Sequence, residues 1–240
     1  MQIQVWCRTD KGLKRDSNQD SYLINKNLGL YIVADGMGGH SGGEVASAMA
    51  TKVVEDVVYR HHNTSAHPRE ILSKAYREAS NRIYDRASQD SRLTGMGTTM
   101  VLCYLKGNSA FVANVGDSRA YLYNKPNFWQ LTEDHSLMNE QLRAGVITED
   151  QMKSFMNKNV ITRSVGYERD VEVDVLERAI VPGDCFLLCS DGFSGLVPDA
   201  TAAEILKRTK PEKVADVCVD RALQNGGDDN VTVLYLQVDA

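Results

Sequence analysis

The sequence has 240 residues, of which 42% are hydrophobic and 25% are charged, and its formal net charge is -5. This composition is typical of a globular protein and excludes an intrinsically disordered chain. The acidic balance, with no block of Lys or Arg, argues against a nucleic-acid binder. No apolar run reaches the ~18–20 residues of a membrane span, and the first residues lack the features of a secretory signal.

Cysteines and linkers indicate the compartment and the domain organisation. The five cysteines lie at positions 7, 103, 185, 189 and 218. Their number is odd and no Cys-x-x-Cys pair occurs, so a disulfide framework is not expected and a cytoplasmic location is predicted. No Pro-rich or low-complexity linker divides the chain, so one continuous domain over residues 1–240 is predicted.

The predicted elements form blocks of strands separated by helices. The first 35 residues are predicted to be strands, and residues 30–34 are a continuous apolar run typical of a buried strand. A glycine-rich loop then leads into predicted helices over 44–62 and 68–87, where apolar residues recur at helical spacing. Further strands are predicted at 97–105, 109–115, 119–123, 171–176, 185–189 and 231–238, with short helical pieces between 134 and 158 and a last helix over 211–224. Without strict βαβ alternation, this order predicts an α+β fold in which two sheets pack face to face with helices outside.

Acidic residues lie at the ends of five predicted strands. Asp20, Asp35, Asp117, Asp191 and Asp229 each precede or follow an apolar stretch directly or within two residues. Any one of them could equally be a turn residue or a helix cap. Together they would repel one another and lose hydration, and bound cations would relieve both costs. Oxygen ligands suit Mg²⁺ or Mn²⁺, and a two-metal site can activate water for in-line attack on phosphorus.

Arg15 is a candidate anchor for a phosphate group beside these acids. It lies five residues before Asp20, and a guanidinium donates a planar pair of hydrogen bonds to phosphate oxygens. Taken alone, an arginine in a polar N-terminal stretch is better explained as a solvated surface residue.

Six short motifs follow one another along nearly the whole chain. They are RDSNQD (15–20), VADGMGGH (33–40), GMGTT (95–99), VGDSR (115–119), SDG (190–192) and GDDNVT (227–232). Each motif is weak by itself, but the six in this order resemble the metal-dependent protein serine/threonine phosphatases of type 2C, and most of all their short bacterial members. The resemblance implies a four-layer α-β-β-α sandwich of two antiparallel sheets flanked by helix pairs, with a flap subdomain at about 133–165.

The resemblance also implies roles for the acidic residues. Asp35 would bridge two Mn²⁺ or Mg²⁺ ions, the Gly36 carbonyl would ligate one of them, and Asp191 and Asp229 would complete the centre. Asp20 and Gln19 would hold metal-bound waters. Asp117 would contribute, with Asp191 and Asp20, to a third, weaker metal site. Arg15 would bind the substrate phosphate, and a metal-bridging hydroxide would attack phosphorus without a covalent intermediate.

One departure from many eukaryotic relatives concerns the general acid. Those relatives carry a histidine directly after the Asp-Gly pair, whereas Met37 holds that place here and His40 follows three residues later. His40 is the candidate acid, with a loop hydrogen bond or protonation by metal-bound water as alternatives. His135 is a second candidate.

Other functions are weighed against this interpretation. No Gly-Lys-Ser/Thr sequence occurs, so a nucleotide-binding P-loop is excluded, and no arginine lies six residues after a cysteine, which excludes a cysteine phosphatase. A pseudophosphatase acting as a binding module and a hydrolase of small phosphoesters remain alternatives. The implied partners are phosphorylated proteins, substrates of a Ser/Thr kinase, with no nucleic acid and no membrane. The protein is expected to be a monomer in a bacterial cytoplasm.

Overall fold

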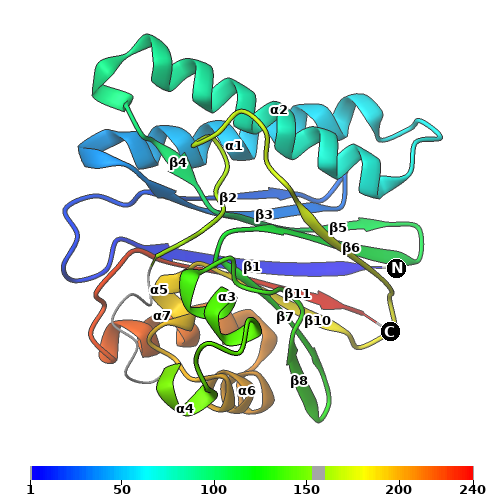
Figure 1. The fold of residues 1–240 in the computed structure, drawn as a ribbon. Coiled ribbons are helices and arrows are strands. Elements are labelled where there is room, and N and C mark those ends of the chain that lie inside the picture. The colour runs from blue at the N-terminus through cyan, green and yellow to red at the C-terminus, as the bar shows by residue number, and fades with distance from the viewer. Residues whose placement is uncertain (1, 153–159, 240) are drawn as a thin grey trace.

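The computed structural model describes residues 2–152 and 160–239, without the side chains of residues 39–41 and 149. Two antiparallel sheets pack face to face, and helices cover the outer face of each (Figure 1). The first sheet contains, in spatial order, β1 (Ile3–Asp10), β11 (Val231–Val238), β10 (Cys185–Cys189), β7 (Arg119–Asn124) and β8 (Asn127–Gln130). The second contains β2 (Asp20–Asn25), β3 (Leu30–Met37), β5 (Met100–Lys106), β6 (Ser109–Val115) and β9 (Asp174–Ala179), with the short β4 (Gly97–Thr98) paired to β3. The predicted four-layer α-β-β-α sandwich is thereby confirmed.

The helices divide between the two outer faces. The long helices α1 (Gly39–His61) and α2 (Pro68–Gln89) lie on the second sheet, as Figure 1 shows. The first sheet is covered by α5 (Asp191–Ser194), α6 (Asp199–Arg208) and α7 (Val214–Gln224). Two short 3-10 turns, η1 (Ser91–Leu93) and η2 (Pro211–Lys213), precede β4 and α7. None of the described helices is long and apolar enough to cross a lipid bilayer.

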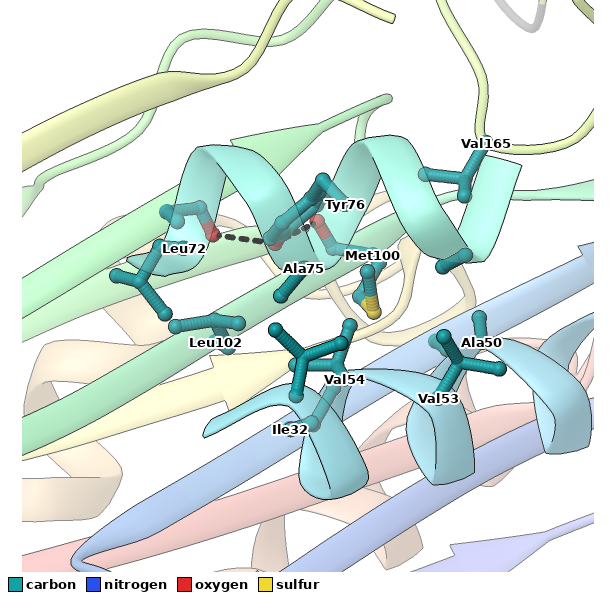
Figure 2. Close-up of a cluster of buried hydrophobic side chains, with 14 of the residues drawn as sticks. Ile32, Ala50, Val53, Val54, Leu72, Ala75, Tyr76, Met100, Leu102 and Val165 are labelled. Atoms are coloured by element: carbon teal, nitrogen blue, oxygen red, sulfur yellow. Dashed lines mark hydrogen bonds between the residues drawn. The ribbon is translucent and has the colours of Figure 1, made fainter. Parts of the chain in front are cut away.

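The core under α1 and α2 shows how the layers are held in place. Val53 and Val54 of α1 and Ala75 and Tyr76 of α2 belong to one buried apolar cluster with residues of β3 and β5 (Figure 2). The Tyr76 hydroxyl donates to the carbonyls of Met100 and Ala113, both at 3.0 Å, so the buried phenol is satisfied by the sheet backbone. A second cluster fills the space between the sheets, and a third lies under α6 and α7. This packing fixes the strand ends that carry the acidic residues.

The structure corrects several predicted boundaries and adds elements. Helix α1 begins at Gly39 rather than residue 44, and β9 begins at Asp174 rather than residue 171. Helix α6 and strand β8 were not predicted. The apolar residues of α6 at 202, 205 and 206 have helical spacing, but they span less than two turns, and β8 is a four-residue edge strand.

The predicted flap is built of short pieces. It contains α3 (Leu137–Arg143) and α4 (Glu149–Met152), and its return segment pairs Ile161 with Ser136 and Val165 with Thr98. Residues 153–159 of the predicted flap lie outside the described part of the chain.

Candidate active site

The strand ends meet at one pocket of about 450 Å³. Of the residues predicted from the sequence, it is lined by Arg15, Gln19, Asp35, Gly36, Asp117, Asp191 and Asp229. Asp20 does not line the pocket, but β2 and β3 place it opposite Asp35 in register. Residues that are far apart in the sequence are therefore brought together as the strand-end pattern predicted.

Two threonines for which the sequence predicted no role hold the backbone of Asp35 by hydrogen bonds. The Thr98 hydroxyl and the Thr99 backbone N–H both donate to the Asp35 carbonyl, at 2.8 and 2.9 Å. The Asp35 backbone N–H in turn donates to the Thr99 hydroxyl oxygen at 3.2 Å. Both threonines are buried, so the GMGTT motif fixes the position from which Asp35 reaches the pocket.

Buried carboxylate oxygens without partners point to a missing positive charge. Asp20 Oδ2 accepts hydrogen bonds from the hydroxyls of Ser190 (2.8 Å) and Thr232 (2.7 Å), but Asp20 Oδ1 and Asp191 Oδ1 are buried and have no hydrogen-bond partner. A buried acceptor left unpaired costs free energy. Oxygen atoms of this kind are the donors that a hard divalent cation prefers.

The electrostatics of the metal-free pocket favour protonated carboxyls. Burial, followed by the negative charges of Asp191 and Asp229, raises the pKa of Asp20 to about 7. Burial, followed by the charges of Asp191 and Asp134, raises the pKa of Asp117 to about 7 as well. Burial and the neighbouring carboxylates also raise the pKa values of Asp35 and Asp191, which lie close enough for one carboxyl to hydrogen-bond the other. Like charges this close cannot all ionise unless cations sit among them.

The donor set fits divalent ions that keep much of their water. Among residues 2–152 and 160–239, no three His, Cys, Asp or Glu side chains form a ready-made metal cage. Mg²⁺ is usually held by one or two carboxylates and keeps several waters. A site for such ions therefore does not need three protein ligands around each ion, particularly where one carboxylate is shared between two ions. The residues present therefore fit such ions.

Arg15 reaches the same pocket from the N-terminal loop. Its Nη2 donates to Asp229 Oδ2 at 2.6 Å, and about half of its side chain is exposed. Asn230 anchors this loop: its Nδ2 donates to the carbonyls of Lys11 and Ser17, and its Oδ1 accepts from the Gln19 N–H. The loop is thereby tied to the residue that follows Asp229, a role that the sequence pattern did not reveal.

Asp117 lies on a tight turn that the base of the flap holds. The His135 N–H donates to the Gly116 carbonyl at 2.9 Å, and His135 Nδ1 accepts from the Gly116 N–H at 3.0 Å. Its Nε2 bonds to Asp174 at 3.1 Å. Both ring nitrogens are thus engaged in a buried side chain, and desolvation lowers the pKa of His135. This geometry suits a positioning role better than proton donation to a substrate.

His40, the first candidate for the general acid, lies in the first turn of α1. Its side chain is outside the described part of the structure, so its catalytic role stays a prediction.

Gly36 makes a close approach that only glycine allows. A Cβ atom there would lie 2.0 Å from the Gly43 carbonyl oxygen and 2.7 Å from the Gln19 carbonyl oxygen. Because both neighbours are backbone, we expect Gly36→Ala to cost about 1–3 kcal/mol or more in free energy of unfolding, measured by chemical denaturation. Gly107→Ala is the matched control: nothing lies near its Cβ and its φ of +62° costs about 1 kcal/mol. Equal losses in the two variants would contradict the steric argument.

Comparison with known proteins agrees with this geometry. The family model described as Protein phosphatase 2C matches residues 10–231. A serine/threonine phosphatase stp of Listeria innocua is 41% identical over 238 residues, covering 96% of this chain and 94% of that protein. Stp1 from Staphylococcus aureus superposes with a TM-score of 0.91 at 31% identity, covering 100% of this chain and 96% of the other. The catalytic domain of PstP, solved in complex with two manganese ions, superposes with a TM-score of 0.86 at 32% identity, covering 99% of each chain. The chain belongs to the protein phosphatase 2C family.

Proposed function

We propose that this protein is a metal-dependent protein serine/threonine phosphatase. The observation that carries the proposal is the cluster of five aspartates around one pocket, two of which have buried oxygens without partners, with Arg15 at its rim. Bound divalent cations would neutralise these carboxylates and supply an activated water for direct attack on phosphorus. The alternative of a pseudophosphatase has no support. A member without activity would be expected to have lost metal ligands, whereas Asp35, Asp191 and Asp229 all line the pocket together with Arg15.

The proposed roles follow the positions of the side chains. Asp35, Asp191 and Asp229, with the Gly36 carbonyl, would hold two Mn²⁺ or Mg²⁺ ions, and Asp20 would orient waters. Asp117 would hold a third, more weakly bound ion. The Thr98 and Thr99 hydrogen bonds keep Asp35 in place during turnover, since they act on its backbone.

We further propose the cellular setting that goes with this activity. The substrates are phosphoserine and phosphothreonine residues of proteins, placed there by a Ser/Thr kinase. The protein acts as a monomer in the cytoplasm, as a single phosphatase domain over residues 1–240, and binds neither nucleic acid nor membranes.

Hydrolysis of a phosphothreonine peptide tests the proposed function. We expect phosphate release with added Mn²⁺, none in EDTA, and no loss after thiol alkylation, since the mechanism uses no cysteine. Absence of hydrolysis by protein shown to have bound Mn²⁺ would overturn the proposal.

Arg15→Ala is expected to weaken substrate binding more than metal binding. In the wild type one guanidinium nitrogen pairs with Asp229, which leaves further N–H donors for phosphate oxygens. We expect KM for a phosphopeptide to rise at least about tenfold, as for the loss of a charge-assisted hydrogen bond of about 1.5–3 kcal/mol. Mn²⁺ affinity, measured by calorimetry, should change much less. Arg15→Lys keeps the charge without the planar donor pair and should recover part of the loss. A large fall in Mn²⁺ affinity with unchanged KM would contradict this role.

A further inference from the structure

A second hollow of about 570 Å³ continues from the catalytic pocket. The two share Met37, Gly38 and Ile161 as lining residues, so they form one groove. Beyond these residues the groove runs along the chain from Thr162 to Glu172, the segment that passes β4 and approaches α2 before it enters β9 (Figure 1). We call this wall the 162–172 segment.

The 162–172 segment is held in place by contacts along its length. Val165 is buried and exchanges backbone hydrogen bonds of 2.8 and 2.9 Å with Thr98. The Ser80 hydroxyl of α2 donates to the Glu168 carbonyl at 2.6 Å and accepts from the Gly166 N–H at 2.8 Å. The groove wall is thus preformed, which lowers the cost of ordering it when a ligand binds.

The side chains of this wall that line the groove carry more negative than positive charge. Glu168, Asp170 and Glu172 all line the groove, at alternate positions of the chain. Among the described lining residues Arg163 is the one cation, and it pairs with Asp174 at 2.9 Å and with Glu172 at 3.9 Å. Asp170 pairs with Arg77 of α2 at 3.0 Å. Arg169, in the same segment, pairs with Asp85 at 2.7 Å. Within the described part of the chain, Glu168 has no ion-pair partner.

Apolar and aromatic groups accompany these carboxylates. Met37, Ile161 and Val171 line the groove, and Tyr167 is 62% exposed beside them. Such a surface suits a side chain with an apolar stem and a cationic end, because the stem packs on the apolar groups while the charge meets carboxylates or the tyrosine ring.

We propose that this groove binds the substrate's flanking residues and selects phosphopeptides that carry Lys or Arg within a few residues of the phosphorylated position. The inference rests on the proposed function, because it assigns the occupant through continuity with the catalytic pocket. One solvent-exposed charge pair, as between a single Arg of the peptide and Glu168, gives a preference of up to about fivefold in kcat/KM. The preference should decline as salt is added.

Kinetics on a peptide series tests the groove. The peptides share one phosphothreonine and carry a single Arg, Ala or Glu at successive positions on either side of it. We expect Arg to exceed Ala, and Ala to exceed Glu, at some of these positions. In Glu168→Gln and in Glu168→Gln/Glu172→Gln the ratio of Arg-peptide to Ala-peptide kcat/KM should fall stepwise toward one. The ratio cancels any general loss of activity in a variant.

Glu212→Gln is the matched control. Glu212 is exposed on η2, on the side of the molecule covered by α6 and α7, and its replacement removes the same charge. It should keep the wild-type ratio. Hydrolysis without any preference for Arg would overturn the inference alone, as would a preference that persists in the double variant. No manganese-dependent hydrolysis of any peptide would overturn the proposed function and the inference with it.

Discussion

Asp35→Asn should abolish manganese-dependent turnover and, at the same time, stabilise the metal-free protein above neutral pH. Asp35 lies among Asp20, Asp117 and Asp191, and their charges together with burial raise its pKa well above the usual range. An amide of the same size removes one of these like charges, so repulsion in the metal-free pocket falls. The same change removes the central carboxylate of the proposed metal site. Because bound metal would contribute several kcal/mol to transition-state stabilisation, we expect kcat to fall at least about 10³-fold.

Two measurements on the same variant separate these effects. Chemical denaturation in EDTA at about pH 8 should give a higher free energy of unfolding for Asp35→Asn than for the wild type. Thermal melts with added Mn²⁺ should show stabilisation of the wild type and a much smaller shift in the variant. Asp216→Asn replaces a half-exposed acid of α7 that pairs with Lys213, and it should behave like the wild type in both. Destabilisation of metal-free Asp35→Asn, or an unchanged Mn²⁺ shift, would contradict the assignment.

The positions of the acidic residues could be predicted from the sequence because of a local signal. Each acid adjoins an apolar strand, and strand ends collect at the edges of a sandwich, so Asp35, Asp117, Asp191 and Asp229 were expected to meet. The order of the six motifs then supplied the fold and the family. Both expectations depended on residue type and spacing, which are visible without coordinates.

The supporting contacts could not be predicted in this way. Asn230 ties the Arg15 loop to the first sheet through residues more than 200 positions away, and His135 holds the Gly116 turn from the flap. Each depends on side-chain direction and backbone distance, which the sequence does not carry. The acidic groove likewise joins residues of β3 to the 162–172 segment, whose charged residues are unremarkable in the sequence because exposed acids are common.

In the absence of metal, the free energy of unfolding should fall as the pH rises from about 4 to about 7. Asp20 and Asp117 have pKa values of about 7 in the folded protein and the ordinary value of 3.8 when unfolded. Between these limits the folded state holds protons that the unfolded state has lost, so each rise in pH favours unfolding. Asp35 and Asp191 shift in the same direction. The pKa of Asp90 is lowered to about 2, so its contribution to the free energy of unfolding is lost only below about pH 4.

His135 works in the opposite direction within part of this window. Its pKa is lowered, so the unfolded state gains a proton first as the pH falls below about 6.5, and stability is lost on that side. His135 is one group, whereas four carboxyls have raised pKa values. The free energy of unfolding should therefore still decrease as the pH rises. His135→Asn would remove the opposing contribution and should steepen the decrease.

Manganese should reverse this dependence, because cations compete with protons for the same carboxylates. Denaturation curves measured in EDTA and with saturating Mn²⁺ at several pH values give the stabilisation by metal as the difference between them. That difference should grow steadily from about pH 4 to about pH 7 and level off only at higher pH, where the carboxyls of Asp20 and Asp117 are ionised. Asp117→Asn should reduce the slope in EDTA, since it removes one of the two groups whose pKa lies near 7. A free energy of unfolding that rises across this window in EDTA would show that the carboxyls are already ionised without metal, and would contradict the mutual repulsion on which the metal site is argued.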